Sequence, residues 1–338
     1  MSPLSPQQAS RLAPARPPSQ QGSPRPLADR TRQAAHSPTP VVSAPKDFSY
    51  LLRPEIYHPL TPLSIPLPFR NSVKQPQPDT SLQELLARGH YRAAAIAAVH
   101  ALTGTAGATA PDPSDHARIF SLIYTRLACL TLIDSTQLAA QEVKALEDLN
   151  SAFYIDEVSG VHLVPWELRV LNVRLQAMGF GDPRRAIMSY YDLAKEARAR
   201  IADATSSHDN SARELWKDRL CDLGIKVAGA LVEMDDLAGA AAHLSTLKDQ
   251  RQGDMAMSKA LLWLHLGDVD AARQCIATGG VSEKTIAALC AMADGEYLAA
   301  IEIWKDLQEN VNDEMIGVNM AVCLLYVGKL EEVNTTSF

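Results

Sequence analysis

One pattern of apolar and polar residues recurs four times between about residues 226 and 332. A helix-like apolar run ends in a turn that begins with Gly or Asp, and a second helix-like run follows. The turns recur at spacings of about 32, 28 and 33 residues, close to the period of about 34 that is typical of tetratricopeptide-type helical hairpins. The turns occupy residues 235–237, 267–269, 295–297 and 328–330.

Small residues hold fixed places around these turns. Alanine lets two antiparallel helices approach closely without weakening either helix, and a turn glycine can take the positive φ that ends the first helix. Larger residues one helical turn later, Leu244, Ile276 and Trp304, are expected to fill the space between hairpins. The alanines are Ala228, Ala260, Ala288 and Ala321 before the turns and Ala240, Ala272 and Ala300 after them, and the glycines are Gly267, Gly295 and Gly328.

The same pattern appears less regularly earlier in the chain, from near Ser81, and an aromatic insertion at residues 151–165 interrupts it. Since no such hairpin buries its apolar face alone, neighbouring hairpins must stack. We therefore predict an all-α solenoid of tetratricopeptide-like hairpins over residues 80–333, with unrelated amphipathic helices as the alternative. The earlier repeat positions are Gly89, Ala94, Gly181 and Ala186.

The last hairpin is expected to be cut short, because only residues 331–338 follow Leu330. A solenoid needs a polar cap on its last hairpin. Either a partner covers this end, or the sequence is a truncated form.

Two segments precede the helical region. Residues 1–46 are rich in Pro, Ser, Gln and Arg and bury too little apolar surface to offset their ordering entropy, so we predict a disordered tail. Residues 47–76 are apolar and rich in proline, and prolines at the density of residues 47–70 exclude a helix. This extended segment either packs on the protein itself or docks on a partner, for which the candidate contacts are Tyr50, Leu51 and Tyr57.

Charge and cysteine content narrow the functional classes. The net charge is −7, and the tail at residues 1–46 contributes +5, which leaves −12 for the rest. An acidic body argues against nucleic-acid binding. The five cysteines form no C-x-x-C pair, so buried free thiols in a reducing compartment are expected rather than zinc. No signal peptide and no apolar run of about 20 residues is present, so no transmembrane segment is predicted.

The sequence contains no recognisable catalytic or cofactor motif. Gly328-Lys329 lacks the rest of a P-loop, and Gly179-Phe180-Gly181 lies between two predicted helices rather than after a strand. We therefore expect no catalytic residue, cofactor or metal. Trp216 and Trp304 fit packing between hairpins, with contact to a partner protein as the alternative.

Four stretches resemble a known family. They read LLARGHYRAA at residues 85–94, VPWELRVL at 164–171, ELWKDRL at 214–220 and NMAVCLLYVGKL at 319–330. Together they are similar, in the same order, to subunit 12 of fungal trafficking protein particle (TRAPP) complexes. The resemblance covers about residues 81–330 and includes the insertion before Pro165, which a generic repeat would not reproduce.

The resemblance implies a non-catalytic accessory subunit of a vesicle-tethering complex. Such a complex is a nucleotide-exchange factor for a Rab GTPase in ER-to-Golgi and Golgi traffic, is linked to autophagy, and carries its exchange chemistry on other subunits. This chain would join subunits 8, 11 and 13 and would meet the GTPase only indirectly. It would be cytoplasmic, peripheral to Golgi and ER–Golgi membranes. Members continue past the position of Leu330, and no binding motif carries over residue by residue.

Two other classes stay open on sequence grounds. A tetratricopeptide co-chaperone adaptor binds a peptide carboxylate in a basic groove, which needs Lys, Arg or Asn repeated on adjacent hairpins. Here Lys259 and Asn319 are isolated. The third class is an enzyme with a helical lid domain.

Overall fold

The computed structural model describes residues 46–61, 65, 67–70, 72, 75–77, 79–247, 253–275, 281–311 and 313–335. All of them belong to one compact unit that spans residues 44–338. Of the tail predicted at residues 1–46, only Lys46 is described, and Ile276 also lies outside the described residues.

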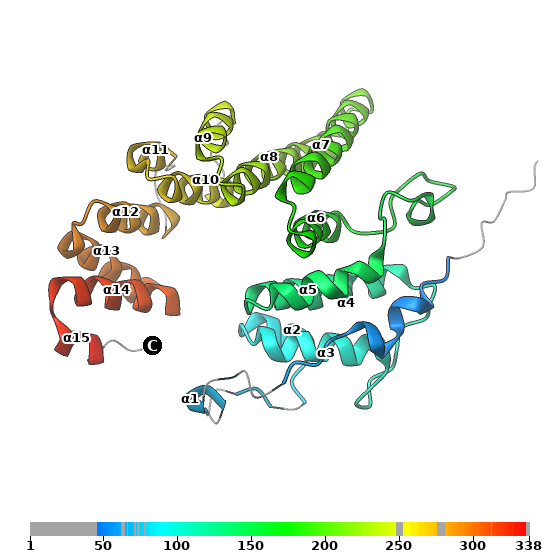
Figure 1. Cartoon of the computed structure of the whole chain (residues 1–338), viewed down its shortest axis with the longest axis horizontal. Helices are drawn as coiled ribbons and strands as arrows, with labels where there is room; N and C mark the ends of the chain where they lie inside the picture. The colour runs from blue at the N-terminus through cyan, green and yellow to red at the C-terminus, as the bar shows by residue number, and fades with distance from the viewer. Residues whose placement is uncertain are drawn as a thin grey trace, which may run out of the picture. The chain divides into compact units, whose positions relative to one another are not determined.

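The described residues form mostly α-helices, which are joined by short turns and, between α3 and α4 and before α6, by longer loops (Figure 1). The N-terminal elements are η1 (Ser49–Leu52), η2 (Pro54–Ile56), α1 (Leu67–Arg70), α2 (Leu82–Ala87), α3 (Tyr91–Thr103), α4 (His116–Leu132), α5 (Thr136–Glu142), η4 (Val143–Leu146), η5 (Ala152–Tyr154) and α6 (Trp166–Phe180). The remaining helices are α7 (Pro183–Ser206), α8 (Asn210–Glu233), α9 (Leu237–Thr246), α10 (Gly253–His265), α11 (Val269–Gln274), α12 (Val281–Ala293), α13 (Tyr297–Asn310), α14 (Glu314–Val327) and α15 (Leu330–Thr335).

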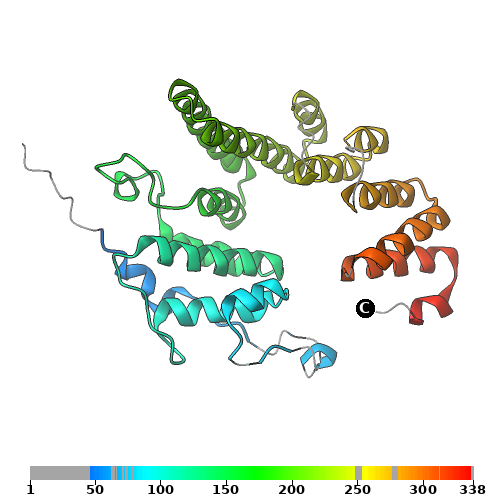
Figure 2. The same ribbon diagram turned by 180° about the vertical axis from the view of Figure 1, so that it is seen from behind.

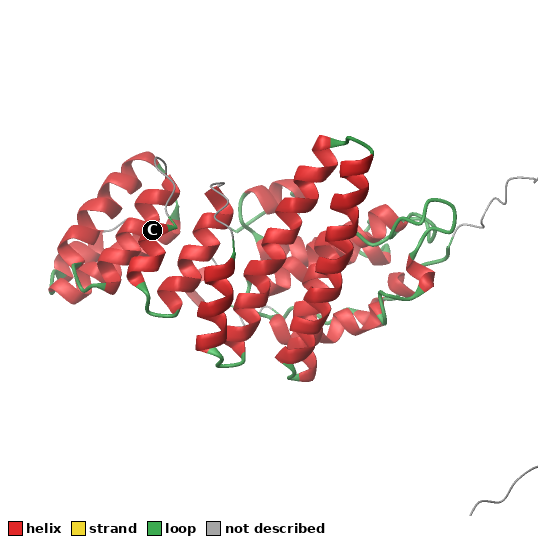
Figure 3. Ribbon diagram, turned by 90° about the horizontal axis from the view of Figure 1, so that it is seen from above, coloured by secondary structure: helices red, strands yellow, loops and turns green. Residues whose placement is uncertain are grey.

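No strand occurs in the part of the chain that the structure describes (Figure 3). The only β-type pairing there is an isolated antiparallel bridge between Ile155 and His162, within the insertion before α6. For these residues the prediction of an all-α fold is confirmed.

Aspartates start many of the helices. Helices α4, α7, α8, α9, α11 and α14 follow an Asp whose carboxylate accepts a hydrogen bond from a backbone N–H of the first turn. This bond satisfies one of the donors that a helix start leaves free. The local sequence therefore fixes where these helices begin.

A positive φ separates the two helices at each of the four predicted turns. The residues concerned are Asp235, Gly267, Gly295 and Gly328, with φ of 62°, 82°, 79° and 81°. Gly89 and Gly181 take the same conformation earlier in the chain. At Gly295 a side chain would be strained by the backbone alone, because a Cβ there would meet nothing within 4 Å.

Helices that follow each other in sequence pack together. Contacts join α3 to α4, α7 to α8, α8 to α9, α10 to α11, α12 to α13 and α13 to α14. Helices α7 and α8 lie side by side along much of their length (Figure 3), and the succession from α12 to α14 is also visible from behind (Figure 2). Helix α10 additionally contacts α8 and α12.

The alanines of the repeat pattern are buried. Ala94, Ala186, Ala228, Ala240, Ala260, Ala272, Ala288, Ala300 and Ala321 are all less than a tenth exposed. Leu244 and Trp304, two of the three larger residues of the pattern, are fully buried. After the final turn, α15 is a helix of only six residues.

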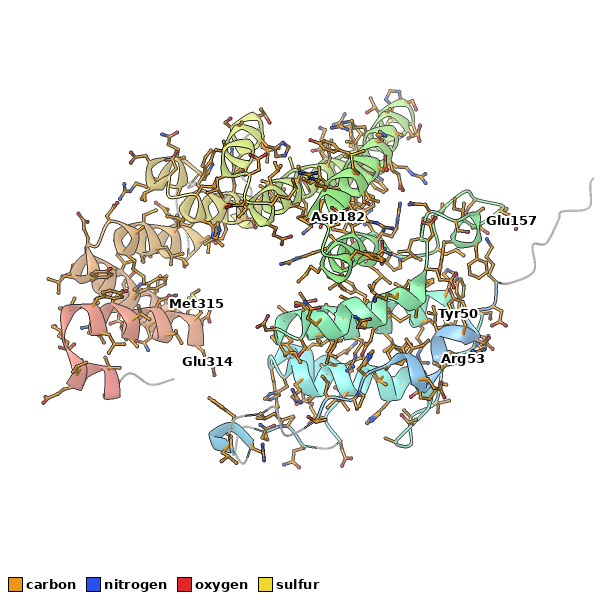
Figure 4. All side chains as sticks on the ribbon, in the orientation of Figure 1. Tyr50, Arg53, Glu157, Asp182, Glu314 and Met315 are labelled. Carbon is orange, nitrogen blue, oxygen red and sulfur yellow. The ribbon has the colours of Figure 1, made fainter. Side chains whose placement is uncertain are left out.

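Residues 46–61, here called the strap, pack on the protein's own helices. Phe48 and Leu51 are buried in a core that they share with α4 and with η4 to η5. The Phe48 ring meets the Phe120 ring edge-on, with centroids 5.1 Å apart. Figure 4 labels Tyr50 and Arg53 on this strap and Glu157 on the insertion before α6. Among the described residues, the segment therefore packs on the protein itself.

The expectation that proline excludes a helix from residues 47–70 is wrong. Pro54 begins the 3₁₀ turn η2, and Pro68 lies in the first turn of α1. The first N–H groups of a helix have no partner within it, so a proline there removes no hydrogen bond. Proline spacing limited these elements to single turns without preventing them.

Candidate functional site: a groove lined by α4, α6, α7, α8 and α10

One hollow among the described residues is a groove of about 1030 Å³. Side chains of five helices line it: α4, α6, α7, α8 and α10. Figure 1 labels these five helices. Apolar residues on two of these helices stay open to solvent: Leu132 on α4 is 62% exposed and Leu261 on α10 is 43% exposed. Tyr124 on α4 is also exposed. Exposed apolar side chains that gather along a concave surface are typical of interaction sites.

A cluster of aromatic rings and arginines builds one wall. Trp166 at the start of α6 meets Trp216 of α8 edge-on, with ring centroids 5.1 Å apart. The guanidinium of Arg219 lies over both rings, at 5.4 Å and 4.7 Å from their centroids. The same guanidinium pairs with Glu167 at 3.1 Å. These contacts join the start of α6 to α8.

One polar group in this wall lacks a partner. The Trp166 side chain is 6% exposed, and its indole nitrogen has no hydrogen-bond partner. A buried donor without an acceptor costs about 1–3 kcal/mol. A buried tryptophan in a structural core usually pairs its N–H.

Burial and nearby carboxylates raise the pKa of two tyrosines that line the groove. The pKa of Tyr124 is raised, chiefly by burial and further by the carboxylates Glu167 and Asp222. Burial raises the pKa of Tyr190 to about 12; Arg174 opposes this shift, and Glu233 and Asp222 add to it.

The charges along the groove are mostly paired. Lys226 lies 3.4 Å from Asp222, and Arg174 lies 3.9 Å from Glu233. Asp218 has no ion-pair partner among the described residues, although it also lines the groove. The groove therefore carries one carboxylate in excess of its cations.

A second hollow, of about 700 Å³, lies on the other side of α6. Its central feature is an ion pair in which Arg169 Nη1 donates to Glu196 Oε1 at 3.0 Å. The pKa of Glu196 is lowered; burial alone would raise it, and the hydrogen bonds and charge of Arg169 outweigh that effect. The side-chain oxygen of buried Asn172 has no partner there. The charges of this hollow are of both signs.

Burial disfavours the thiolate form of four of the cysteines. Burial raises the pKa of Cys129, Cys221, Cys290 and Cys323, and the thiolate is the reactive form of cysteine. The structure gives all five cysteines as free, three buried and two half-buried. Within the described ranges, no three His, Cys, Asp or Glu residues gather to hold a metal ion. Searched over the same ranges, the helices include none with the length and apolar character needed to cross a bilayer.

The five residues proposed as partner contacts have different fates. Leu51 is 1% exposed and Trp304 is 0% exposed, so neither presents a surface to a partner, and these two assignments are corrected. Trp304 is instead sealed inside its hairpin, where its indole donates to the Met292 sulfur. Trp304 packs in one core with the repeat alanines Ala288 and Ala300, whereas Leu51 packs in the core that the strap shares with α4.

The other three keep some exposure. The Tyr50 hydroxyl is 2.7 Å from the Tyr154 hydroxyl, and the Tyr57 hydroxyl donates to the Leu51 carbonyl at 2.7 Å. The Tyr50 hydroxyl therefore links the strap to the insertion before α6, and the Tyr57 hydroxyl bonds within the strap. Trp216 is half-buried and packs against Trp166, which lines the groove.

Sequence reasoning missed the open apolar residues of the groove. A signal was present on α4, whose buried core stripe includes Ile119, Ile123 and Leu127. A second stripe, Tyr124, Ala128, Thr131 and Leu132, follows helical spacing on another face and lines the groove. When a helix has two apolar faces and one of them packs in the core, the other face is available to bind a partner.

Comparison of the chain with protein-family models, with curated proteins and with solved structures found no match in any of the three.

Proposed function

We propose that this chain is a non-catalytic scaffold subunit of a TRAPP-like vesicle-tethering complex, built as a solenoid of tetratricopeptide-like hairpins. Its role is to hold other subunits, such as those that resemble subunits 8, 11 and 13, while the Rab exchange chemistry resides elsewhere. It works at the cytoplasmic surface of Golgi and ER–Golgi membranes without entering them.

The observation that carries the proposal is the groove and the origin of its wall. Two of the four stretches that resemble the TRAPP family, residues 164–171 and 214–220, meet there through the Trp166–Trp216 contact and the Glu167–Arg219 ion pair. Segments some 50 residues apart in sequence thus build one surface. Open leucines beside that surface support a role in binding proteins.

The hairpins support the solenoid part of the proposal. Four turns with positive φ recur at the predicted positions, and each separates two helices, with buried alanines on the flanking helices. Helix α10 contacts both α8 and α12, which are first helices of the neighbouring hairpins. First helices that touch along a row are the packing expected of stacked hairpins.

Affinity purification tests the function. The tagged chain, expressed at its native level in its own cell, should recover tethering subunits in constant ratios by quantitative mass spectrometry. Recovery of chaperones without tethering subunits would instead assign the chain to the co-chaperone adaptors. The purified chain alone should leave GTPase nucleotide exchange at its basal rate.

A further inference from the structure

The groove presents two apolar sides that face a common space. Leu132 on α4 and Leu261 on α10 come from helices far apart in sequence, and both line the same groove. Their open surface favours a ligand with a continuous apolar face.

The charges along the groove then indicate which charge a ligand should carry. Asp218 lacks an ion-pair partner among the described residues, and the carboxylates Glu167, Asp222 and Glu233 lie near enough to act on the groove tyrosines. A cation brought by a ligand would meet a carboxylate that has no ion-pair partner, whereas an anion would find the lining cations Arg174, Arg219 and Lys226 already paired. The complementary ligand is therefore basic along one flank.

The secondary structure of the groove walls favours one backbone conformation of the ligand. All five lining elements are helices, and their backbone N–H and C=O groups are mostly used within the helices. The described residues offer no strand edge on which an extended peptide could pair. An extended segment would bury unpaired backbone groups, at a cost that a helix avoids because its hydrogen bonds are internal.

Aromatic recognition of a proline-rich peptide is also disfavoured. Such peptides need several exposed rings, and here Trp166 is 6% and Tyr190 is 2% exposed. Only Tyr124 presents an open ring from the lining residues. A helix that lays apolar side chains into the groove fits this surface better.

We infer that the groove binds one amphipathic helix of a partner protein, whose apolar stripe covers Leu132 and Leu261 and whose basic flank faces Asp218. This inference rests on the proposed scaffold function and names the chemistry of the partner. The ligand helix carries large aliphatic residues at positions i, i+3, i+4 and i+7, with Lys or Arg beside them.

Fluorescence anisotropy with the full chain tests the chemistry. The probe is a labelled synthetic peptide of about five helical turns, with leucines on one face and lysines on its flanks. Two matched peptides serve as comparisons: one with Glu in place of Lys, and one with the same composition in scrambled order. The Lys peptide should bind at least about tenfold more tightly than either. Equal binding of the Glu peptide, or no binding of the Lys peptide, overturns the inference.

Variants locate the site. Leu132→Gln and Leu261→Gln change exposed positions, so the chain should still fold, and each should weaken the Lys peptide about tenfold. Leu325→Gln is the matched control, because Leu325 is 52% exposed on α14 outside the groove. Asp218→Asn should weaken the Lys peptide but not the Glu peptide. Loss of binding in L325Q alone, or unchanged binding in both groove variants, contradicts the inference.

The two proposals fail in different ways. If the parent chain recovers tethering subunits and the double variant L132Q/L261Q recovers them equally, the scaffold function stands and the groove is not its docking site. If the Lys peptide binds as predicted but the parent recovers no tethering subunits, the groove inference stands and the TRAPP-like function fails.

Discussion

Arg126 and Glu142 form a buried ion pair that also binds both backbone groups of His58. The guanidinium Nη2 lies 2.7 Å from the carboxylate Oε1, and Nε donates to Oε2 at 3.0 Å. The His58 N–H donates to the same carboxylate at 2.8 Å, and the His58 carbonyl accepts from the same guanidinium at 2.7 Å. The strap thus completes the hydrogen bonding of two charges that are 1% and 4% exposed.

Removing one of these charges should be severely destabilising. Arg126→Met leaves the Glu142 carboxylate buried without its cation, which should lower the free energy of unfolding by about 3–5 kcal/mol. The double variant R126M/E142L should lose less, because it buries no charge. Urea unfolding at neutral pH measures both.

An exposed ion pair provides the control for this experiment. Arg88 pairs with Glu84 on the surface of α2, so Arg88→Met should change the free energy of unfolding by less than about 1 kcal/mol. If R126M unfolds at the urea concentration of R88M, the Arg126–Glu142 pair contributes nothing special and the interpretation fails.

Enlarging a buried alanine at a helix crossing should also destabilise the chain. Ala300 on α13 has no exposed surface, so Ala300→Leu should overpack the crossing and cost about 1–3 kcal/mol. The neighbouring Ala299 is exposed, and A299L should be close to neutral. Thermal unfolding compares the pair, and equal melting temperatures would reject the proposed repeat register.

Replacing a turn glycine with alanine should change stability in the opposite direction to replacing a glycine inside a helix. Gly295 has a φ of +79°, so Gly295→Ala should cost about 1–2 kcal/mol through backbone strain, although the added methyl meets nothing. Gly229 lies inside α8 without such a φ and also with free space, so G229A should gain about 0.5–1 kcal/mol. Chemical denaturation gives the sign of each change; the same sign in both variants would contradict the assignment of the turn.

Acid should weaken the insertion before α6 through His162. The Val164 N–H donates to His162 Nδ1 at 3.0 Å, and Nε2 lies 2.9 Å from the Leu149 carbonyl, so the ring must be neutral with its proton on Nε2. Burial, and secondarily Arg169, lowers the pKa of His162 below its ordinary value of 6.5. The unfolded chain then binds this proton first, so stability falls as the pH drops through 6.5.

The measurement is the free energy of unfolding as a function of pH. His162→Gln should flatten the slope just below pH 6.5 relative to the parent. The exposed His265→Gln variant is the control and should keep that slope. A proton NMR titration that places the His162 pKa above 6.5 would show that the sign is wrong.

The helices and turns could be predicted because their signals are local. Asp236 and Asp268 each cap the helix that follows, and Gly328 ends the helix before it, all within a few residues of their targets. The strap and the groove could not be predicted, because their partners are distant. Nothing near His58 in the sequence indicates that its backbone will hydrogen-bond to Arg126 and Glu142. The exposure of Leu132 depends on how distant helices pack around α4, which the local sequence does not show.

The strap also affects the order in which parts of the chain can fold during synthesis. Its hydrogen bonds join Tyr50 to Tyr154 and His58 to Glu142, which are 104 and 84 residues apart. At a synthesis rate of about 5–20 residues per second, the strap leaves the ribosome roughly 5–20 seconds before its docking site is complete. The hairpins beyond α6 can close as they emerge, whereas Phe48 and Leu51 of the strap lack their core partners until α4 and η5 have followed, so this is the period in which these apolar side chains most need a chaperone.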